Sequence, residues 1–127
     1  MDRKNTLLKS LGIEITHVSQ EKVTATMPVD ERTRQPFGLL HGGASVALAE
    51  TVASIGAYEC VDKETEVCVG LEINANHIRS KRDGVVTATA IPAHKGKTTM
   101  VWEVKITDEQ DELICISRCT MAVLKKK

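Results

Sequence analysis

One carboxylate interrupts an otherwise apolar stretch of the sequence. Residues 40–58 read LHGGASVALAETVASIGAY, and Glu50 is the one charged side chain among them. The residues three and four positions away are Val, Ala, Ala and Ser, so no Lys or Arg lies at helical spacing to pair with it. Burying an unpaired charge is costly, and proteins retain that cost mainly at functional sites. We therefore expect Glu50 to serve catalysis or ligand binding, the alternative being a surface residue on an exposed stripe of the helix.

A histidine and two glycines, His41-Gly42-Gly43, lie where this helix would begin. Glycine lets a substrate approach the backbone, and the N–H groups of a first helical turn point outward without partners, so a carbonyl oxygen or oxyanion could lodge there. Gly42 lies eight residues before Glu50, roughly 12 Å along a helix axis. A substrate carbonyl would therefore lie over the side of the helix, with Glu50 reaching back toward it. The alternatives are a helix-entry turn for the glycines and a helix-start hydrogen bond for His41.

Two uncharged polar side chains lie near these residues in the sequence. Gln35 precedes Pro36 in the connecting loop and could donate an amide hydrogen bond to the same oxygen, or it is only a loop residue. Ser54 lies one turn after Glu50 on the same helical face and could orient a water molecule, or it is a small residue that allows close packing.

The hydrophobic pattern predicts the elements that position these side chains. Apolar and polar residues alternate over 11–19 and 21–29, as in a pair of antiparallel strands. From Ala44 to Tyr58 alanine dominates and proline is absent, which favours a helix. Four more strand candidates are rich in β-branched residues and end at turn sequences; they cover residues 67–80, 84–97, 98–110 and 111–124.

The order of these elements is ββαββββ, which predicts an α+β fold with one antiparallel sheet and a helix on it. The helix is apolar nearly all round, so we expect the sheet to curl around it. A length of 127 residues predicts a single domain over residues 1–127. Only three aromatic residues are available for the core, and such a thin core is often completed by a partner subunit.

Composition excludes several classes of protein. Lys+Arg and Asp+Glu are equal at 17 each, which disfavours nucleic-acid binding. No apolar run approaches the ~20 residues of a membrane span, and the N-terminus lacks the apolar region of a signal peptide. The four cysteines form neither a CxxC motif nor a Cys/His ligand cluster, so we expect reduced thiols, no metal site and a cytoplasmic protein.

The segments RQPFGLLHGGASVALAE and VGLEINANHIRS carry a resemblance to a known family. They resemble the hotdog-fold acyl-CoA thioesterases of the phenylacetate-degradation type, especially the bacterial enzymes that hydrolyse 1,4-dihydroxy-2-naphthoyl-CoA in menaquinone synthesis. The resemblance runs from about Leu11 to Leu124. The HGG motif followed seven residues later by Glu is specific for this branch, and in the hotdog fold a β-sheet wraps one long helix.

The resemblance implies a role for each candidate residue. Glu50 matches the catalytic carboxylate, acting as nucleophile on the thioester carbon or as base for water. Gly42 matches the backbone N–H that polarises the thioester oxygen, and Gln35 matches the side chain placed near that oxygen. Ser54 matches the hydroxyl that helps to hold the nucleophilic water, and His41 matches a supporting histidine.

The resemblance also implies how the substrate is held. The family works as a dimer, often as a dimer of dimers, with the active site between subunits and without a metal or another cofactor. Val69 and Gly70 match positions that line the partner's side of the acyl pocket. The region that holds the pantetheine and phosphates of CoA corresponds to His77, Arg79, His94, Lys95, Gly96 and Lys97. Many relatives have arginine where this chain has Lys97, and the alternative for this basic group is a solvated hairpin turn.

The expected activity is therefore hydrolysis of an acyl-CoA thioester to the free acid and CoA. The resemblance favours hydroxylated aromatic acyl groups, while benzoyl, phenylacetyl and aliphatic groups remain open. Two other functions compete with this prediction. One is a non-catalytic acyl-CoA-binding or sensing hotdog module, and the other is a hotdog dehydratase or hydratase.

Overall fold

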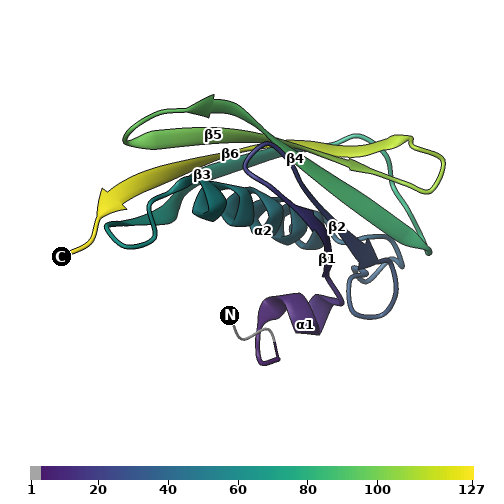
Figure 1. Ribbon diagram of the computed structural model, residues 1–127. Coiled ribbons are helices and arrows are strands. Elements are labelled where there is room, and N and C mark those ends of the chain that lie inside the picture. The colour runs from purple at the N-terminus through teal and green to yellow at the C-terminus, as the bar shows by residue number, and fades with distance from the viewer. Residues whose placement is uncertain (1–3) are drawn as a thin grey trace.

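The computed structural model describes residues 4–127, which form two helices and six strands (Figure 1). Their order along the chain is helix, two strands, helix and four strands. The bounds are α1 (Leu7–Leu11), β1 (Glu14–Val18), β2 (Val23–Pro28), α2 (Gly42–Cys60), β3 (Glu66–His77), β4 (Val85–Lys95), β5 (Thr99–Thr107) and β6 (Leu113–Lys125).

All six strands belong to one antiparallel sheet in the order β1-β2-β4-β5-β6-β3. The long helix α2 lies along one face of this sheet, and the sheet curves around it (Figure 1). The edges of the sheet are β1 and β3, and β3 is a 12-residue strand that pairs on one side only, with β6. The predicted α+β fold, with its order ββαββββ, is confirmed.

The core lies between the sheet and α2. In β2 every second residue is buried, which matches the predicted alternation of Val23, Ala25 and Met27. On α2, Leu48 and Val52 face the sheet and are fully buried. The largest fully buried side chain is that of Trp102 on β5, and the aliphatic side chains around it are smaller.

The helix α1 was not predicted. Leu11 alternates with Ile13 and Ile15 in the sequence and was assigned to a strand, but it ends α1, and β1 begins only at Glu14. Gly12 caps α1 with a positive φ of 73°, a conformation that favours glycine, and its N–H donates to the carbonyls of Leu8 and Lys9. A five-residue helix is too short to be stable by itself and carries little periodic signal.

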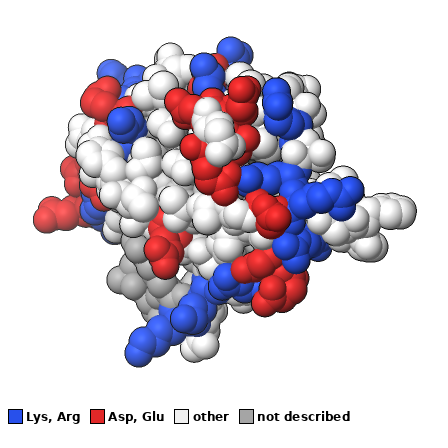
Figure 2. Space-filling model, turned by 90° about the vertical axis from the view of Figure 1, so that its right-hand side faces the viewer, with Lys and Arg blue, Asp and Glu red and all other residues white. Residues whose placement is uncertain are grey.

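The second helix also differs from its predicted bounds. It begins at Gly42 rather than Ala44, so both glycines lie in the first turn instead of preceding it. Among residues 4–127, no helix is long and apolar enough to cross a membrane. The described His, Cys, Asp and Glu residues form no group of three that could hold a metal ion. Figure 2 shows positive and negative side chains side by side on one face of the molecule.

Candidate active site

The first turn of α2 presents a free backbone donor. His41 is the N-cap, and its Nδ1 accepts a hydrogen bond of 2.8 Å from the N–H of Gly43. An Nδ1 that accepts leaves the imidazole proton on Nε2. Within the described part of the chain the N–H of Gly42 has no acceptor, as expected for the first residue of a helix. His41 thus makes the helix-start hydrogen bond that the sequence left open.

The backbone of Gly42 faces the imidazole of His77, from the end of β3. A Cβ on Gly42 would lie 2.9 Å from Nε2 of His77, so a side chain at this position would displace the ring. The two residues line a cavity of about 320 Å³. Four sequence-predicted residues meet there, namely Gln35, Gly42, His77 and Arg79, together with Leu39, Leu40, Ser45, Ile78, Ser80 and Ile114.

The amide of Gln35 is oriented by its own loop. Its Oε1 accepts from the backbone N–H of Phe37 at 2.5 Å and from that of Leu39 at 3.5 Å. The oxygen is therefore occupied, and among the described residues no acceptor pairs with Nε2. Gln35 Nε2 and the N–H of Gly42 are two available donors on one cavity, which is what a developing oxyanion requires.

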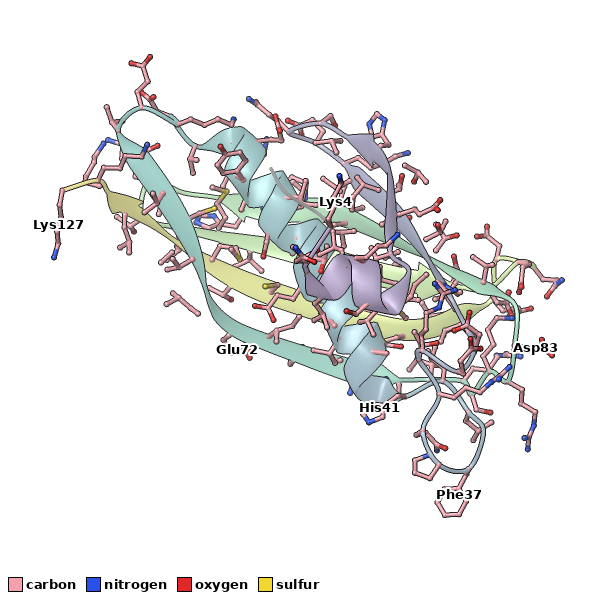
Figure 3. All side chains as sticks on the ribbon, turned by 90° about the horizontal axis from the view of Figure 1, so that it is seen from below. Lys4, Phe37, His41, Glu72, Asp83 and Lys127 are labelled. Atoms are coloured by element: carbon pink, nitrogen blue, oxygen red, sulfur yellow. The ribbon has the colours of Figure 1, made fainter. Side chains whose placement is uncertain are left out.

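Hydrogen bonds to the segment after β3 hold the loop that carries Gln35. The N–H of Leu40 donates to the carbonyl of Lys81 at 2.8 Å, and Nε of Arg34 donates to the carbonyl of Arg82 at 2.8 Å. The N–H of His41 donates to the carbonyl of Thr33 at 2.8 Å, which closes the loop on itself. Figure 3 shows Phe37 at the tip of this loop and His41 where the loop meets α2.

Glu109 fixes the far side of this segment, and the sequence analysis missed it. Its carboxylate accepts from Nζ of Lys81 at 2.6 Å and from the N–H of Val85 at 2.8 Å. These two hydrogen bonds lower the pKa of Glu109 to about 2, and the one from Lys81 has the larger effect. The acidic sequence DEQDE indicated only a turn, because a pairing across 28 residues leaves no local pattern.

Glu50 lies two turns along α2, on the face that points away from the sheet. Its side chain is exposed, so the expected burial of Glu50 among apolar residues is wrong for this chain, and Glu50 lies on the exposed stripe that was the alternative. Oε2 lies 3.0 Å from the position that a Cβ on Gly70 would occupy, so the carboxylate rests against the middle of β3. None of the described Lys and Arg residues forms an ion pair with Glu50.

Glu50 and Ser54 line one cavity of about 430 Å³, together with Leu7, Leu8, Ala47, Thr51 and Ile55. The hydroxyl of Ser54 lies 3.9 Å from Sδ of Met121, which is a weak contact that a water molecule could replace. The small residue Ala47 lines the cavity. Ala53 and Ala57 do not, because both face the sheet and are fully buried.

The donors and the carboxylate therefore form two separate half-sites in one chain. The cavity of Gly42 and the cavity of Glu50 share no residue. Eight residues of helix separate the two, roughly 12 Å along its axis, and a thioester carbonyl is far shorter than that. Within one chain the two donors and the carboxylate are therefore not brought together.

The remaining predicted substrate residues lie apart from Gly42. Val69 is 43% exposed on the edge strand β3. The β4–β5 turn with His94, Gly96 and Lys97 lies at the end of the sheet where α2 ends, opposite the start of the helix (Figure 1). Lys95 forms an ion pair of 2.7 Å with Glu21, and this hydrogen bond raises the pKa of Lys95.

Comparisons with known proteins show the family of the chain. Residues 37–115 match the Thioesterase superfamily. The 1,4-dihydroxy-2-naphthoyl-CoA hydrolase of Listeria monocytogenes serotype 1/2a (strain 10403S) is 55% identical over 121 residues, which are 95% of this chain and 98% of the relative. The chain therefore belongs to the Thioesterase superfamily, with the hotdog fold, and is a thioester hydrolase as expected.

Two solved structures are similar over nearly the whole chain. The thioesterase PA1618 from Pseudomonas aeruginosa has a TM-score of 0.94 and 50% identity, covering 98% of this chain and 89% of that one. SAV0944 from Staphylococcus aureus has a TM-score of 0.92 and 45% identity, covering 95% and 100%. SAV0944 was solved with alanine replacing a glutamate and, separately, a glutamine. These two positions are as far apart in its sequence as Gln35 and Glu50 are here.

Proposed function

We propose that this thioesterase hydrolyses an aromatic acyl-CoA to the free acid and CoA, with a hydroxylated ring system of the 1,4-dihydroxy-2-naphthoyl, gentisyl or hydroxybenzoyl type as its acyl group. The observation that carries the proposal is the pair of half-sites on α2, one with two free donors and the other with an exposed carboxylate beside an apolar cavity. The naphthoyl-CoA hydrolase name of the 55% identical relative supports the aromatic class.

In the proposed reaction the thioester oxygen accepts hydrogen bonds from the N–H of Gly42 and from Nε2 of Gln35. Glu50 then attacks the carbonyl carbon, or it takes a proton from a water molecule that attacks. In the base route, protonated Glu50 returns its proton to the sulfur as the C–S bond breaks, so CoA leaves as the thiol and the acid keeps the hydroxyl of water. In the nucleophile route, the C–S bond breaks to give CoA thiolate and a mixed anhydride on Glu50. Water then hydrolyses the anhydride, which gives the free acid, restores the Glu50 carboxylate and supplies the proton for the thiolate. One positioned donor contributes about 10²–10³-fold and a general base about 10²–10⁴-fold. Ser54 holds the attacking water beside Glu50, and His41 keeps the first turn in place.

Two copies of the chain are needed to join the half-sites. The edge strand β3 is the natural surface for this, because a long unpaired edge pairs readily with a second strand. Twofold pairing of β3 with its copy would run the two α2 helices in opposite directions. The start of one helix would then lie near the middle of the other, where Glu50 rests against Gly70. The protein is accordingly a homodimer or a dimer of dimers, with Val69 at the shared edge.

The same pairing provides cations for CoA. His77 and Arg79 line the cavity of Gly42, and Arg79 is held only by a 3.5 Å ion pair with Glu112 in which both side chains are more than half exposed. The turn of His94, Lys95, Gly96 and Lys97 would come from the other copy. Lysine ammonium and arginine guanidinium both bind phosphate, the latter in a bidentate manner. We expect this protein in the cytoplasm, because CoA esters are its proposed substrates and its four cysteines are free thiols.

The acyl class is tested by measuring thiol release from a panel of acyl-CoA esters. We expect the highest kcat/KM for 1,4-dihydroxy-2-naphthoyl-CoA or another hydroxylated aryl-CoA, with aliphatic esters lower. In an apolar pocket the kcat/KM values of related acyl groups differ by only about 10–200-fold. The ranking of all the esters is therefore more informative than any one rate. A higher kcat/KM for aliphatic esters than for every aryl ester would contradict the aromatic assignment.

A further inference from the structure

The short helix α1 has no role in the site described so far. None of its residues is buried, and Leu7 is 57% exposed, whereas Leu8 and Leu11 pack partly against the core. Figure 1 and Figure 3 both show α1 lying across the side of α2 that faces away from the sheet. Apolar side chains of α1 thus cover the face of α2 that carries Glu50.

Leu7 and Leu8 form one wall of the Glu50 cavity. The opposite wall is α2, from Ala47 to Ile55, so Glu50 and Ser54 lie across a space of about 430 Å³ from α1. This volume falls within the range of small-molecule sites. Among the described residues that line the space, Glu50 is the charged one.

Leu7 also separates this space from a second one. A cavity of about 290 Å³ lies toward the start of α2, and Leu7, Leu11, His41, Gly43 and Ala47 are among its lining residues. Leu7 and Ala47 are the two residues that line both cavities. The side chain of Leu7 therefore closes the Glu50 cavity on the side of the helix start, and its volume decides how far a ligand extends there.

The position of α1 is set from its C-terminal end. Gly12 caps the helix, and the N–H of Ile13 donates to the carbonyl of Leu8 at 2.9 Å, next to the buried side chain of Ile13. Leu7 lies about one turn before this C-terminal end of α1 and buries little of its own side chain. A substitution of Leu7 is therefore expected to leave the fold intact while it changes the cavity.

We propose that α1, through Leu7 and Leu8, is the outer wall of the acyl pocket and determines which acyl groups reach Glu50. The proposal rests on the proposed function. The occupant is an uncharged acyl group, aromatic or aliphatic, because a carboxylate-bearing acyl chain would meet the carboxylate of Glu50, and none of the described wall residues is a cation that would balance it. Leu7 is a specificity-determining residue rather than a catalytic one.

The test compares Leu7→Trp and Leu7→Ala with Ser10→Trp, a matched control on the same helix whose side chain is exposed and lines neither cavity. Circular dichroism verifies folding of each variant. We expect Leu7→Trp to lower kcat/KM for 1,4-dihydroxy-2-naphthoyl-CoA by about tenfold or more relative to acetyl-CoA, since a filled pocket rejects the larger group. Leu7→Ala should shift the ratio the other way, and Ser10→Trp should leave it unchanged.

A uniform change across all thioesters in both Leu7 variants would overturn the role of α1. The affinity of a non-hydrolysable aryl thioether of CoA, measured by calorimetry, distinguishes this failure from failure of the proposed function. If the wild-type protein hydrolyses no aryl-CoA, the proposed function is wrong. Even then, weaker binding of the aryl thioether to Leu7→Trp but not to Ser10→Trp would support the pocket wall, and equal binding would overturn it.

Discussion

The N–H of Gly42 and the carboxylate of Glu50 lie in different surroundings. Among the described residues no acceptor pairs with the N–H of Gly42, and His77 fills the place of a side chain there, as the 2.9 Å distance to a Cβ indicates. Glu50 is exposed beside Gly70 and forms no ion pair with a described Lys or Arg residue. The sequence predicted both residues from the helix start and from the isolated charge. It could not predict their separation into two cavities, because that depends on which side of α2 each one faces.

Glu109 provides a test of how the loop that carries Gln35 is held in place. Its pKa of about 2 lies below the ordinary 4.5, so the ionised carboxylate stabilises the folded state above pH 4.5. This contribution is lost as the pH falls from about 4.5 toward about 2. We expect Glu109→Gln to lower the melting temperature at pH 7, and the difference from wild type to shrink as the pH falls through this window.

Thermal unfolding followed at pH 7 and at pH 3 measures this difference. Glu112→Gln serves as the control, since it removes a negative charge from the same turn, where the carboxylate reaches Arg79 only at 3.5 Å. An equal loss of melting temperature at both pH values for Glu109→Gln would show that the carboxylate does not act through its ionised form.

The close approach of α2 to β5 depends on Gly56. A Cβ on this residue would lie 2.5 Å from the ring of Trp102, which is fully buried. Alanine would gain up to about 1 kcal/mol of helix propensity, but overpacking a core costs about 1–3 kcal/mol. Because the Cβ would overlap the ring severely, the cost lies near the upper end of this range, and we expect Gly56→Ala to lower the free energy of unfolding by about 2 kcal/mol.

Chemical denaturation measures this change, and Gly43→Ala is the matched control on the same helix. A Cβ on Gly43 would meet the exposed imidazole of His41 at 2.9 Å, so Gly43→Ala disturbs the N-cap of α2 but leaves the contact between α2 and β5 intact. If Gly56→Ala were as stable as wild type, Trp102 would not be held against α2 as described.

The elements with a clear period were predictable and α1 was not. Alternation over 21–29 predicted β2, and the alanine-rich run predicted α2 to within two residues at each end. The sequence of α1, LLKSL, is too short for a helical period to emerge, and its Leu11 continued the alternation of the next strand. Its position on α2 comes from tertiary contacts of Leu8 and Leu11, which no local pattern contains.

Across the whole molecule, one side of α2 is left uncovered by the sheet. The sequence indicated a helix that is apolar nearly all round, and the sheet covers only the face with Leu48, Ala49 and Val52. The opposite face has the half-buried Val46, Ala47 and Ile55 around Glu50. A second copy of the chain packed on this face and on the open edge of β3 would complete a core that has few aromatic residues.

The proposed joining of half-sites from two copies predicts complementation between inactive variants. Glu50→Gln keeps the donors and loses the carboxylate, whereas Gln35→Ala keeps the carboxylate and loses a donor. Each variant alone should fold and associate like wild type, with hydrolysis reduced by about 10²-fold or more. After the two are refolded together in equal amounts, about a quarter of the sites combine an intact Gln35 with an intact Glu50.

Thiol release from 1,4-dihydroxy-2-naphthoyl-CoA by this mixture is the most direct measurement. The proposed mechanism predicts inactive single variants and recovery of about a quarter of the wild-type rate in the mixture. A near wild-type rate for Glu50→Gln alone would contradict the role of the carboxylate. No recovery in the mixture would contradict a site shared between two copies.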